Sequence, residues 1–170
     1  MKGRGAGEKG FWRNPPRAPL KLFVDTSVFG GMFDPEFMEE TRRFFARALA
    51  GDYRLAVSRQ VYAEIDPAPA PVRELFDAFL PRMELNEDSA EIQRLADAYL
   101  ERKILGKKWL NDALFIAHAT IHRCAGVVSW NFKHIVHEDK ILDFNLVNVR
   151  LGYPQVFVAS PGEFNRHAHR

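Results

Sequence analysis

The stretch Leu20-Lys21-Leu22-Phe23-Val24-Asp25-Thr26-Ser27 decides the fold class of this chain. Its first five residues are mostly apolar and its last three are polar, which is typical of a short buried strand that ends in a polar loop. Comparable apolar runs occur at 54–57, 83–85, 126–130 and 155–158. Helical spacing of apolar residues occupies the segments between them, at 34–49, 58–65, 72–80, 88–100 and from 111 onward. Strands that alternate with helices predict an α/β layer fold with a mainly parallel sheet.

Length and composition indicate a single globular domain. The chain has 170 residues, 46% of them hydrophobic and 27% charged, which is ordinary for one domain with its own core. No apolar run is long enough to span a membrane, and no secretory signal follows the basic start. The single cysteine, Cys124, excludes an internal disulfide framework. We therefore expect a cytoplasmic protein with no membrane association.

Charge divides the chain into a tail and a domain. Residues 1–19 contain five basic residues, one acidic residue, four glycines and three prolines, so the rest of the chain is slightly acidic although the whole carries +2. Such a composition predicts a disordered basic tail, which could hold phosphates without sequence preference. We expect one domain over 20–161 and a flexible C-terminal tail over 162–170.

Three acidic residues occupy positions from which they can converge. Asp25 follows the first strand, Glu64 lies in the short helix after the second strand, and Asp112 lies in the first turn of a helix. Ligands of open α/β sheets gather beyond the carboxyl ends of the strands. Alone, each acid has an ordinary explanation as a cap, a helix-dipole partner or a solvated side chain. Together they need a cation, because two carboxylates 4 Å apart repel by about 4 kcal/mol at an effective dielectric constant of about 20. Oxygen ligands of this kind suit Mg²⁺ or Mn²⁺.

Other acidic or metal sites fit this sequence less well. A haloacid-dehalogenase-like phosphatase needs a second aspartate where this chain has Ser27, and Gly30-Gly31 does not supply a dinucleotide-binding turn. His118 and His122 share one helix face at a spacing that zinc sites use, but the glutamate of the metalloprotease pattern is absent. We interpret the two histidines as surface or packing residues.

The candidate site residues lie in four sequence blocks, which are Leu22-Phe23-Val24-Asp25-Thr26-Ser27-Val28, the segment 58–64, Asn111-Asp112-Ala113-Leu114-Phe115-Ile116-Ala117 and Ser129-Trp130-Asn131-Phe132-Lys133-His134. In this order the blocks resemble the motif blocks of PIN domains, most of all those of VapC-type toxins of toxin–antitoxin pairs. The resemblance spans residues 20–161. It implies an α/β/α sandwich with a twisted parallel sheet, and hydrolysis of RNA phosphodiesters with Mg²⁺ or Mn²⁺. It also implies that Asp25, Glu64 and Asp112 form the acidic cluster, and that Ser27, or alternatively Thr26, is the hydroxyl that orients it.

The chain departs from the family pattern in the fourth block. Many members have an acid at the position of Asn131 or of His134, and this chain has neither. The resemblance then leaves Asn131 as a neutral metal ligand and a second metal in question. A non-catalytic PIN-like module that binds RNA or protein is therefore an alternative to a nuclease, and a purely structural role with solvated acids is a third hypothesis.

Partners follow from the same resemblance. RNA is the expected substrate, with its backbone contacted by Arg59, Lys107, Lys108 and Lys133. Phe29, Trp109 and Trp130 are candidates for stacking on bases, with a core or interface role as the alternative for Trp109 and Trp130. An antitoxin and a second copy of the chain are the expected protein partners, and part of the Phe-rich segment around Phe37, Phe44 and Phe45 is the expected interface.

Overall fold

The computed structural model describes residues 18–102, 110–132 and 135–167, and it contains a parallel sheet with the strand order β3-β2-β1-β4-β5. Every neighbouring pair of strands is parallel, which confirms the mainly parallel sheet expected from the sequence. The strands are β1 (Leu20–Val24), β2 (Tyr53–Ser58), β3 (Met83–Asn86), β4 (Gly126–Val128) and β5 (Phe157–Ala159).

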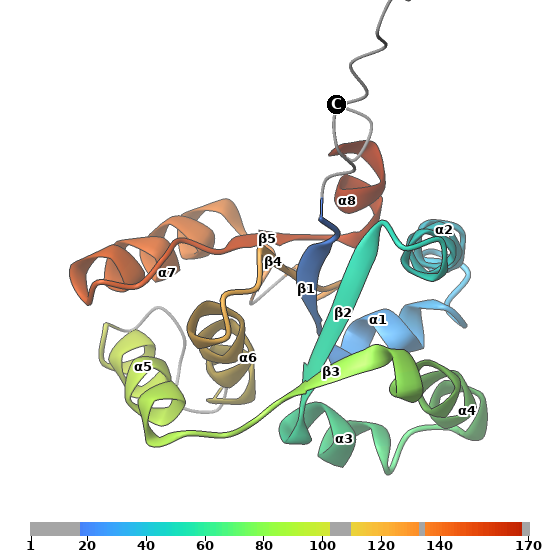
Figure 1. Ribbon diagram of the computed structural model, residues 1–170, viewed down its shortest axis with the longest axis horizontal. Coiled ribbons are helices and arrows are strands. Elements are labelled where there is room, and N and C mark those ends of the chain that lie inside the picture. Colours follow the sequence, from blue (N-terminus) through green and yellow to red (C-terminus); the bar gives the residue numbers. More distant parts are fainter. Residues whose placement is uncertain (1–17, 103–109, 133–134, 168–170) are drawn as a thin grey trace, which may run out of the picture.

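Helices cover both faces of the sheet, as the apolar character of its central strands requires. In Figure 1, α1 to α4 lie on one side of the sheet and α5, α6 and α7 lie on the other, so the α/β/α sandwich is confirmed. Their bounds are α1 (Thr26–Gly31), α2 (Met38–Leu49), α3 (Arg59–Ile65), α4 (Ala70–Phe79), the 3₁₀ turn η1 (Leu80–Arg82), α5 (Ala90–Glu101), α6 (Leu110–Ile121), α7 (Glu138–Arg150) and α8 (Pro161–His167). Among the described helices, none is both long enough and apolar enough to cross a membrane.

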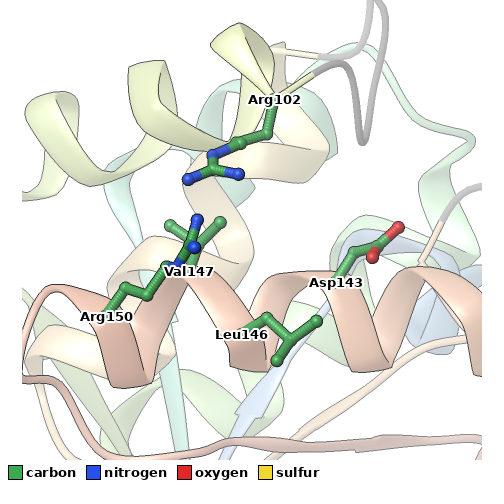
Figure 2. A pocket seen from close by; sticks show the side chains of 5 residues that line it. All are labelled: Arg102, Asp143, Leu146, Val147 and Arg150. Carbon is green, nitrogen blue, oxygen red and sulfur yellow. The ribbon is translucent and has the colours of Figure 1, made fainter.

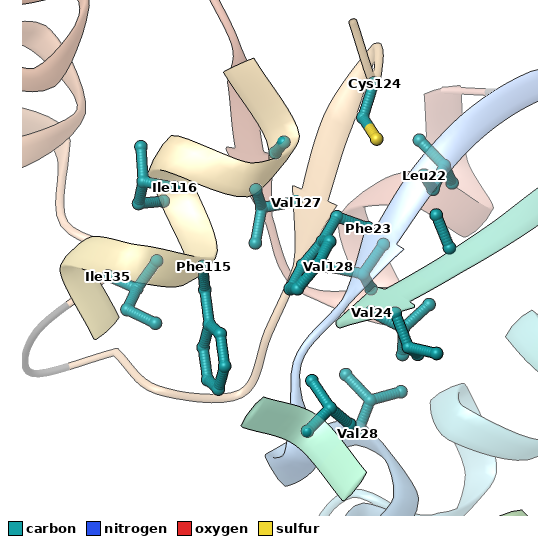
Figure 3. Close-up of a cluster of buried hydrophobic side chains, with 14 of the residues drawn as sticks. Leu22, Phe23, Val24, Val28, Phe115, Ile116, Cys124, Val127, Val128 and Ile135 are labelled. Carbon is teal, nitrogen blue, oxygen red and sulfur yellow. The ribbon is translucent and has the colours of Figure 1, made fainter. Parts of the chain in front are cut away.

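The core is centred on β1, which is the middle strand of the sheet. Its residues Leu22, Phe23 and Val24 are completely buried, and they lie beside side chains of β4 and α6 (Figure 3). The Phe23 ring is tilted against Phe115 of α6 at 5.6 Å between centroids. This packing fixes the carboxyl end of β1, and therefore the position of Asp25.

The order of the strands reverses at β1. The chain proceeds from β1 to β2 and β3 on one side, then crosses to β4 and β5 on the other. A crevice forms at such a switch point, beyond the carboxyl ends of the two strands that flank it. Here these strands are β1, which is followed by Asp25, and β4, which is followed by Ser129.

Several boundaries differ from the sequence prediction. The helix expected from residue 34 begins at Met38, because Asp34 forms a turn in which its side chain accepts a hydrogen bond from the Glu36 amide. The fourth strand ends at Val128 rather than at residue 130. The sequence pattern predicts neither α1 nor α7.

The prediction of a flexible C-terminal tail over 162–170 is wrong for residues up to 167. Residues Pro161–His167 form α8, which packs against α2. Backbone oxygens of α8 accept hydrogen bonds from Arg47 and from the buried Tyr53 hydroxyl, and the Asn165 amide donates to the Glu40 carbonyl oxygen. The expected N-terminal tail lies almost wholly outside the described residues.

Of the three rings of the Phe-rich segment, only Phe37 is accessible to the expected partner. Phe44 and Phe45 are buried, with Phe44 stacked on Tyr53 and Phe45 against Phe79. These rings fill the layer between α2, β2 and α4 instead of facing a partner. Phe37 stays half-exposed beside Trp130.

Candidate acidic site

Asp25 lies at the point where β1 ends and α1 begins, and it is the N-cap residue of α1. It is only 4% exposed, and its Oδ2 atom accepts hydrogen bonds from the hydroxyls of Ser27 at 2.7 Å and Ser129 at 2.5 Å. Its side chain makes no capping hydrogen bond to the helix backbone. The capping explanation of Asp25 therefore does not account for this carboxylate, and its hydroxyl partners hold it in one orientation.

The sequence analysis missed Ser129 as a site residue. Besides donating to Asp25, its hydroxyl accepts a hydrogen bond from the backbone N–H of Asn131 at 2.9 Å. Ser27 has a parallel role, because its oxygen accepts from the Trp130 amide at 3.0 Å. The available signal was a serine at the polar end of a buried strand, inside the fourth sequence block. Ser27 and Ser129 thus tie the ends of β1 and β4 together through one carboxylate.

Asp112 lies in the first turn of α6 and is 9% exposed. The amide nitrogen of Asn131 donates to its Oδ2 atom at 3.3 Å. In this orientation Asn131 offers a donor to Asp112, whereas the sequence prediction gave it the role of an oxygen ligand. Its carbonyl oxygen becomes available to a cation at this position only if the amide rotates.

Glu64 on α3 accepts hydrogen bonds from two residues that are adjacent in sequence to the other two acids. Its Oε2 atom accepts from the Thr26 hydroxyl at 2.7 Å, and its Oε1 atom accepts from the Asn111 amide at 2.8 Å. Thr26 is adjacent to Asp25 and Asn111 is adjacent to Asp112. The alternative assignment of Thr26 as an orienting hydroxyl therefore applies to Glu64, while Ser27 serves Asp25.

Electrostatics show that the three carboxylates are neighbours. Burial, and after it the charges of Asp25 and Glu64, raise the pKa of Asp112 to about 7, while the hydrogen bond from Asn131 and the charge of Lys140 lower it. Burial also raises the pKa of Asp25, which the hydrogen bonds from Ser129 and Ser27 lower and the charge of Glu64 raises again. The charge of Glu64 therefore disfavours ionisation of both Asp25 and Asp112. Among residues 18–102, 110–132 and 135–167, however, no three Asp, Glu, His or Cys side chains are already grouped as ligands of one ion.

Of the four basic residues expected to contact RNA, only Arg59 is described. It is exposed at the start of α3 and pairs with Glu87 at 3.4 Å. Lys107, Lys108 and Lys133 lie outside the described residues, as does Trp109. Phe29 is completely buried against Phe45 and Phe76, so the prediction that it stacks on a base is wrong.

The two histidines of α6 have other partners. His118 is buried, and its Nε2 atom lies 3.2 Å from the Asp88 carboxylate. Burial lowers its pKa, and the Asp88 charge opposes that change. The Nε2 atom of His122 lies 2.9 Å from the Glu87 carbonyl oxygen, and the two rings stack at 5.9 Å. These contacts agree with packing histidines.

Several surface grooves are lined by residues other than the three acids. One of them, of about 380 Å³, lies between the end of α5 and α7 and is lined by Arg102, Asp143, Leu146, Val147 and Arg150 (Figure 2). Another, of about 630 Å³, is lined by Arg59, Tyr62, Ala63, Asp66 and Leu85.

Comparisons with known proteins identify the fold. No family model matches the sequence, and no curated protein matches it. Among solved structures, the VapBC2 structure from Rickettsia felis, bound to a DNA fragment from its promoter, contains a chain that matches with a TM-score of 0.54. That match is 19% identical and covers 83% of this chain and 98% of the other. A toxin–antitoxin complex from Klebsiella pneumoniae contains a chain that matches with a TM-score of 0.51 and 19% identity, over 66% of this chain and 88% of the other. The chain therefore has the fold of VapC-type PIN-domain toxins.

Proposed function

We propose that this protein is a metal-dependent endoribonuclease of the toxin–antitoxin type, which hydrolyses RNA phosphodiester bonds in the cytoplasm. The observation that carries the proposal is the convergence of Asp25, Glu64 and Asp112 at the switch point of a VapC-type PIN fold. The raised pKa of Asp112, caused by burial and by the charges of Asp25 and Glu64, supports it, because strongly perturbed pKa values cluster at functional sites.

The donor set fits Mg²⁺ or Mn²⁺. Carboxylate and amide oxygens are hard ligands, and buried acids with raised pKa values gain most from a cation. Asp25 and Asp112 would hold the ion, and Asn131 would turn its carbonyl oxygen toward it. Glu64 would join when it leaves Thr26 and Asn111. When bound, the ion would supply positive charge against the charge that develops on a phosphodiester during hydrolysis.

The remaining residues position this set. Ser27 and Ser129 both donate to Oδ2 of Asp25, which leaves the role of ligand to Oδ1. The burial of Asp25 and Asp112 excludes bulk water and strengthens every charge interaction at the site. Arg59, together with Lys107, Lys108 and Lys133, is proposed to hold the RNA backbone.

A non-catalytic PIN-like module remains the second candidate, and one observation favours it. Asn131 stands where many PIN domains have an acid, and its amide nitrogen donates to Asp112. That bond lowers the pKa of Asp112 without any cation. In this reading the protein binds RNA or a protein and does not cleave.

Cleavage of total RNA with Mg²⁺ or Mn²⁺ distinguishes the two candidates. The proposal expects cleavage that a chelator stops and that Asp25→Asn abolishes. Asp77→Asn is the matched control, because Asp77 is an exposed aspartate on α4. Cleavage that persists in Asp25→Asn or in the chelator would contradict the proposed site, and RNA binding without cleavage by the wild type would favour the second candidate.

We also propose an antitoxin and a second copy of this chain as partners. The similarity to chains of two toxin–antitoxin complexes supports the first of them. An apolar stripe on α7 supports association through that helix, because Leu142, Leu146 and Val149 are each more than half exposed. Co-expression with a neighbouring small reading frame that encodes a DNA-binding protein, followed by co-purification, tests for the antitoxin.

A further inference from the structure

Three aromatic rings form a shelf beside the acidic cluster. Phe37, the N-cap residue of α2, stacks on Trp130 with 4.4 Å between ring centroids and 23° between planes. Phe132 lies against both, at 5.8 Å from Trp130 and 6.3 Å from Phe37. We call these three residues the aromatic shelf. Phe132 is 45% exposed, so the shelf faces solvent on the side of this ring.

The two inner rings are fixed by specific contacts. The Trp130 indole Nε1 donates to the Thr41 hydroxyl at 2.9 Å, and that hydroxyl donates to the Phe37 carbonyl oxygen at 2.8 Å. Gly31 gives the indole its space, since a Cβ there would lie 2.6 Å from Nε1. The sequence thus uses a glycine and a buried threonine to hold an aromatic surface in place, which is the preorganisation that a binding surface requires.

The shelf is continuous with the acidic cluster. The Trp130 amide donates to Ser27, and the Ser27 hydroxyl donates to Asp25. Asn131 lies between Trp130 and Phe132 in the chain, and its side chain donates to Asp112. The chain segment 130–132, which carries two of the three rings, is therefore hydrogen-bonded to the acidic cluster, and a molecule bound at the acids lies next to this segment.

We propose that the aromatic shelf, through Phe132, stacks on a nucleobase next to the scissile phosphate and so selects single-stranded RNA. This inference rests on the proposed function and deepens it. Exposed aromatic rings bind single strands because the unpaired base offers its face, whereas a duplex base is already stacked on its neighbours. The aromatic contact also suits the charge of the site, since a base brings no negative charge toward the carboxylates.

Binding measurements on the full chain test this directly. Asp112→Asn is the background, so that RNA stays intact, and fluorescence anisotropy follows a labelled single-stranded oligoribonucleotide and the matching duplex in Mg²⁺. Phe132→Ala should weaken binding of the single strand about tenfold, the effect typical of one lost base stack. Phe132→Tyr should keep most of the affinity because it keeps the ring. The duplex should bind more weakly, and Phe132→Ala should change its affinity little.

Phe157→Ala is the matched control. Phe157 is 48% exposed and Phe132 is 45% exposed, but Phe157 begins β5. It therefore lies at the amino ends of the parallel strands, whereas the acids lie beyond the carboxyl ends. The Phe157→Ala variant should bind the single strand with the affinity of the background protein. Thermal melting of each variant verifies that it is folded.

The proposed role of the shelf would be overturned if Phe132→Ala bound the single strand as tightly as the background protein does. It would also be overturned if Phe132→Tyr lost as much single-strand affinity as Phe132→Ala, or if the background protein did not bind the single strand. Failure of the proposed nuclease is distinguishable. Ring-dependent binding of single strands without cleavage by the wild type would refute the catalysis and leave the shelf standing. Cleavage that Phe132→Ala leaves unchanged, with unchanged affinity, would refute the shelf alone.

Discussion

At the scale of single residues, the pKa of Asp112 is raised both by burial and by the charges of two neighbouring acids. The fold raises its pKa to about 7, from an ordinary value of 3.8. Between these pH values the folded protein holds a proton that the unfolded chain has released. Asp112 should therefore make the free energy of unfolding of the metal-free protein fall as the pH rises from about 4 to about 7. Above pH 7 its contribution should change little.

Asp112→Asn should remove much of this dependence. An amide has almost the shape of the carboxyl group but never ionises, so the metal-free variant should be at least as stable as the wild type at pH 8. Urea unfolding in a chelator at pH 5 and pH 8 measures the change, and Asp77→Asn should retain the wild-type difference. If the free energy of unfolding changed by the same amount between pH 5 and pH 8 in Asp112→Asn and in the wild type, Asp112 would be an ordinary surface acid. Mg²⁺ should stabilise the wild type at pH 8 and should stabilise Asp112→Asn much less.

Asn131→Asp tests whether this residue faces the same site. A carboxylate there adds a fourth negative charge beside Asp112, so calorimetry should show Mn²⁺ affinity about tenfold higher, and the metal-free protein should be less stable. Gln155→Glu adds one charge at an exposed position just before β5, near the amino ends of the strands and away from the acids. This control should have the Mn²⁺ affinity of the wild type. Equal Mn²⁺ affinities in all three proteins would remove Asn131 from the ligand set.

The site residues that the sequence predicts are those whose chemistry is visible in a single block. Asp25, Glu64 and Asp112 stand out as acids at the ends of apolar segments. Ser129 does not, because a serine after a buried strand has many structural uses, and only the pairing of β1 with β4 brings its hydroxyl to Asp25. Asn131 is placed correctly near Asp112, but no sequence pattern gives the direction in which its amide points.

At the scale of elements, prediction succeeds where a cap and a single apolar stripe agree. Helix α5 follows Ser89, whose side chain accepts from the Ile92 amide, and its buried residues recur at helical spacing. Helix α7 has no such pattern, since buried Phe144 and Val147 alternate with exposed Leu142 and Leu146. Helix α1 is six residues long and ends in two glycines, so only its contacts with the rest of the fold can stabilise it.

The junction of β4 with α8 offers a test of the C-terminal helix. A Cβ at Gly126 would lie 2.7 Å from the Phe157 carbonyl oxygen and 2.9 Å from the Phe164 ring. Gly126→Ala should therefore cost about 1–3 kcal/mol, since either β5 or α8 must shift. Gly30→Ala in α1 meets no atom within 4 Å and should be neutral or slightly stabilising, because alanine favours a helix.

Denaturant unfolding of both glycine variants decides the matter. If α8 is loosely attached, removal of residues 161–170 should restore much of the stability that Gly126→Ala loses. If α8 is part of the fold, as its contacts with Tyr53 and Arg47 indicate, the same truncation should destabilise the wild type as well.

At the scale of the whole molecule, exposed apolar residues are concentrated on α7. Leu142, Leu146 and Val149 are 62%, 55% and 57% exposed and share one helix face at spacings of four and three residues. Leu151, just beyond the helix, is 53% exposed. The opposite face of α7 packs inward through Phe144 and Val147. A contiguous apolar stripe of this kind indicates association with another protein surface.

We expect this stripe to join two copies of the chain. Light scattering of the wild type at tens of micromolar should give the mass of a dimer, since a self-complementary helix face buries the same leucines on both sides. Leu146→Glu should give a monomer, because it places a charge in the centre of the apolar contact on each copy. Leu49→Glu is the control, since Leu49 is 57% exposed at the end of α2, away from α7, and this variant should remain dimeric. A wild type that is strictly monomeric would contradict self-association. A dimer that survives Leu146→Glu would place the contact elsewhere, and α7 would then be the surface to examine for the antitoxin.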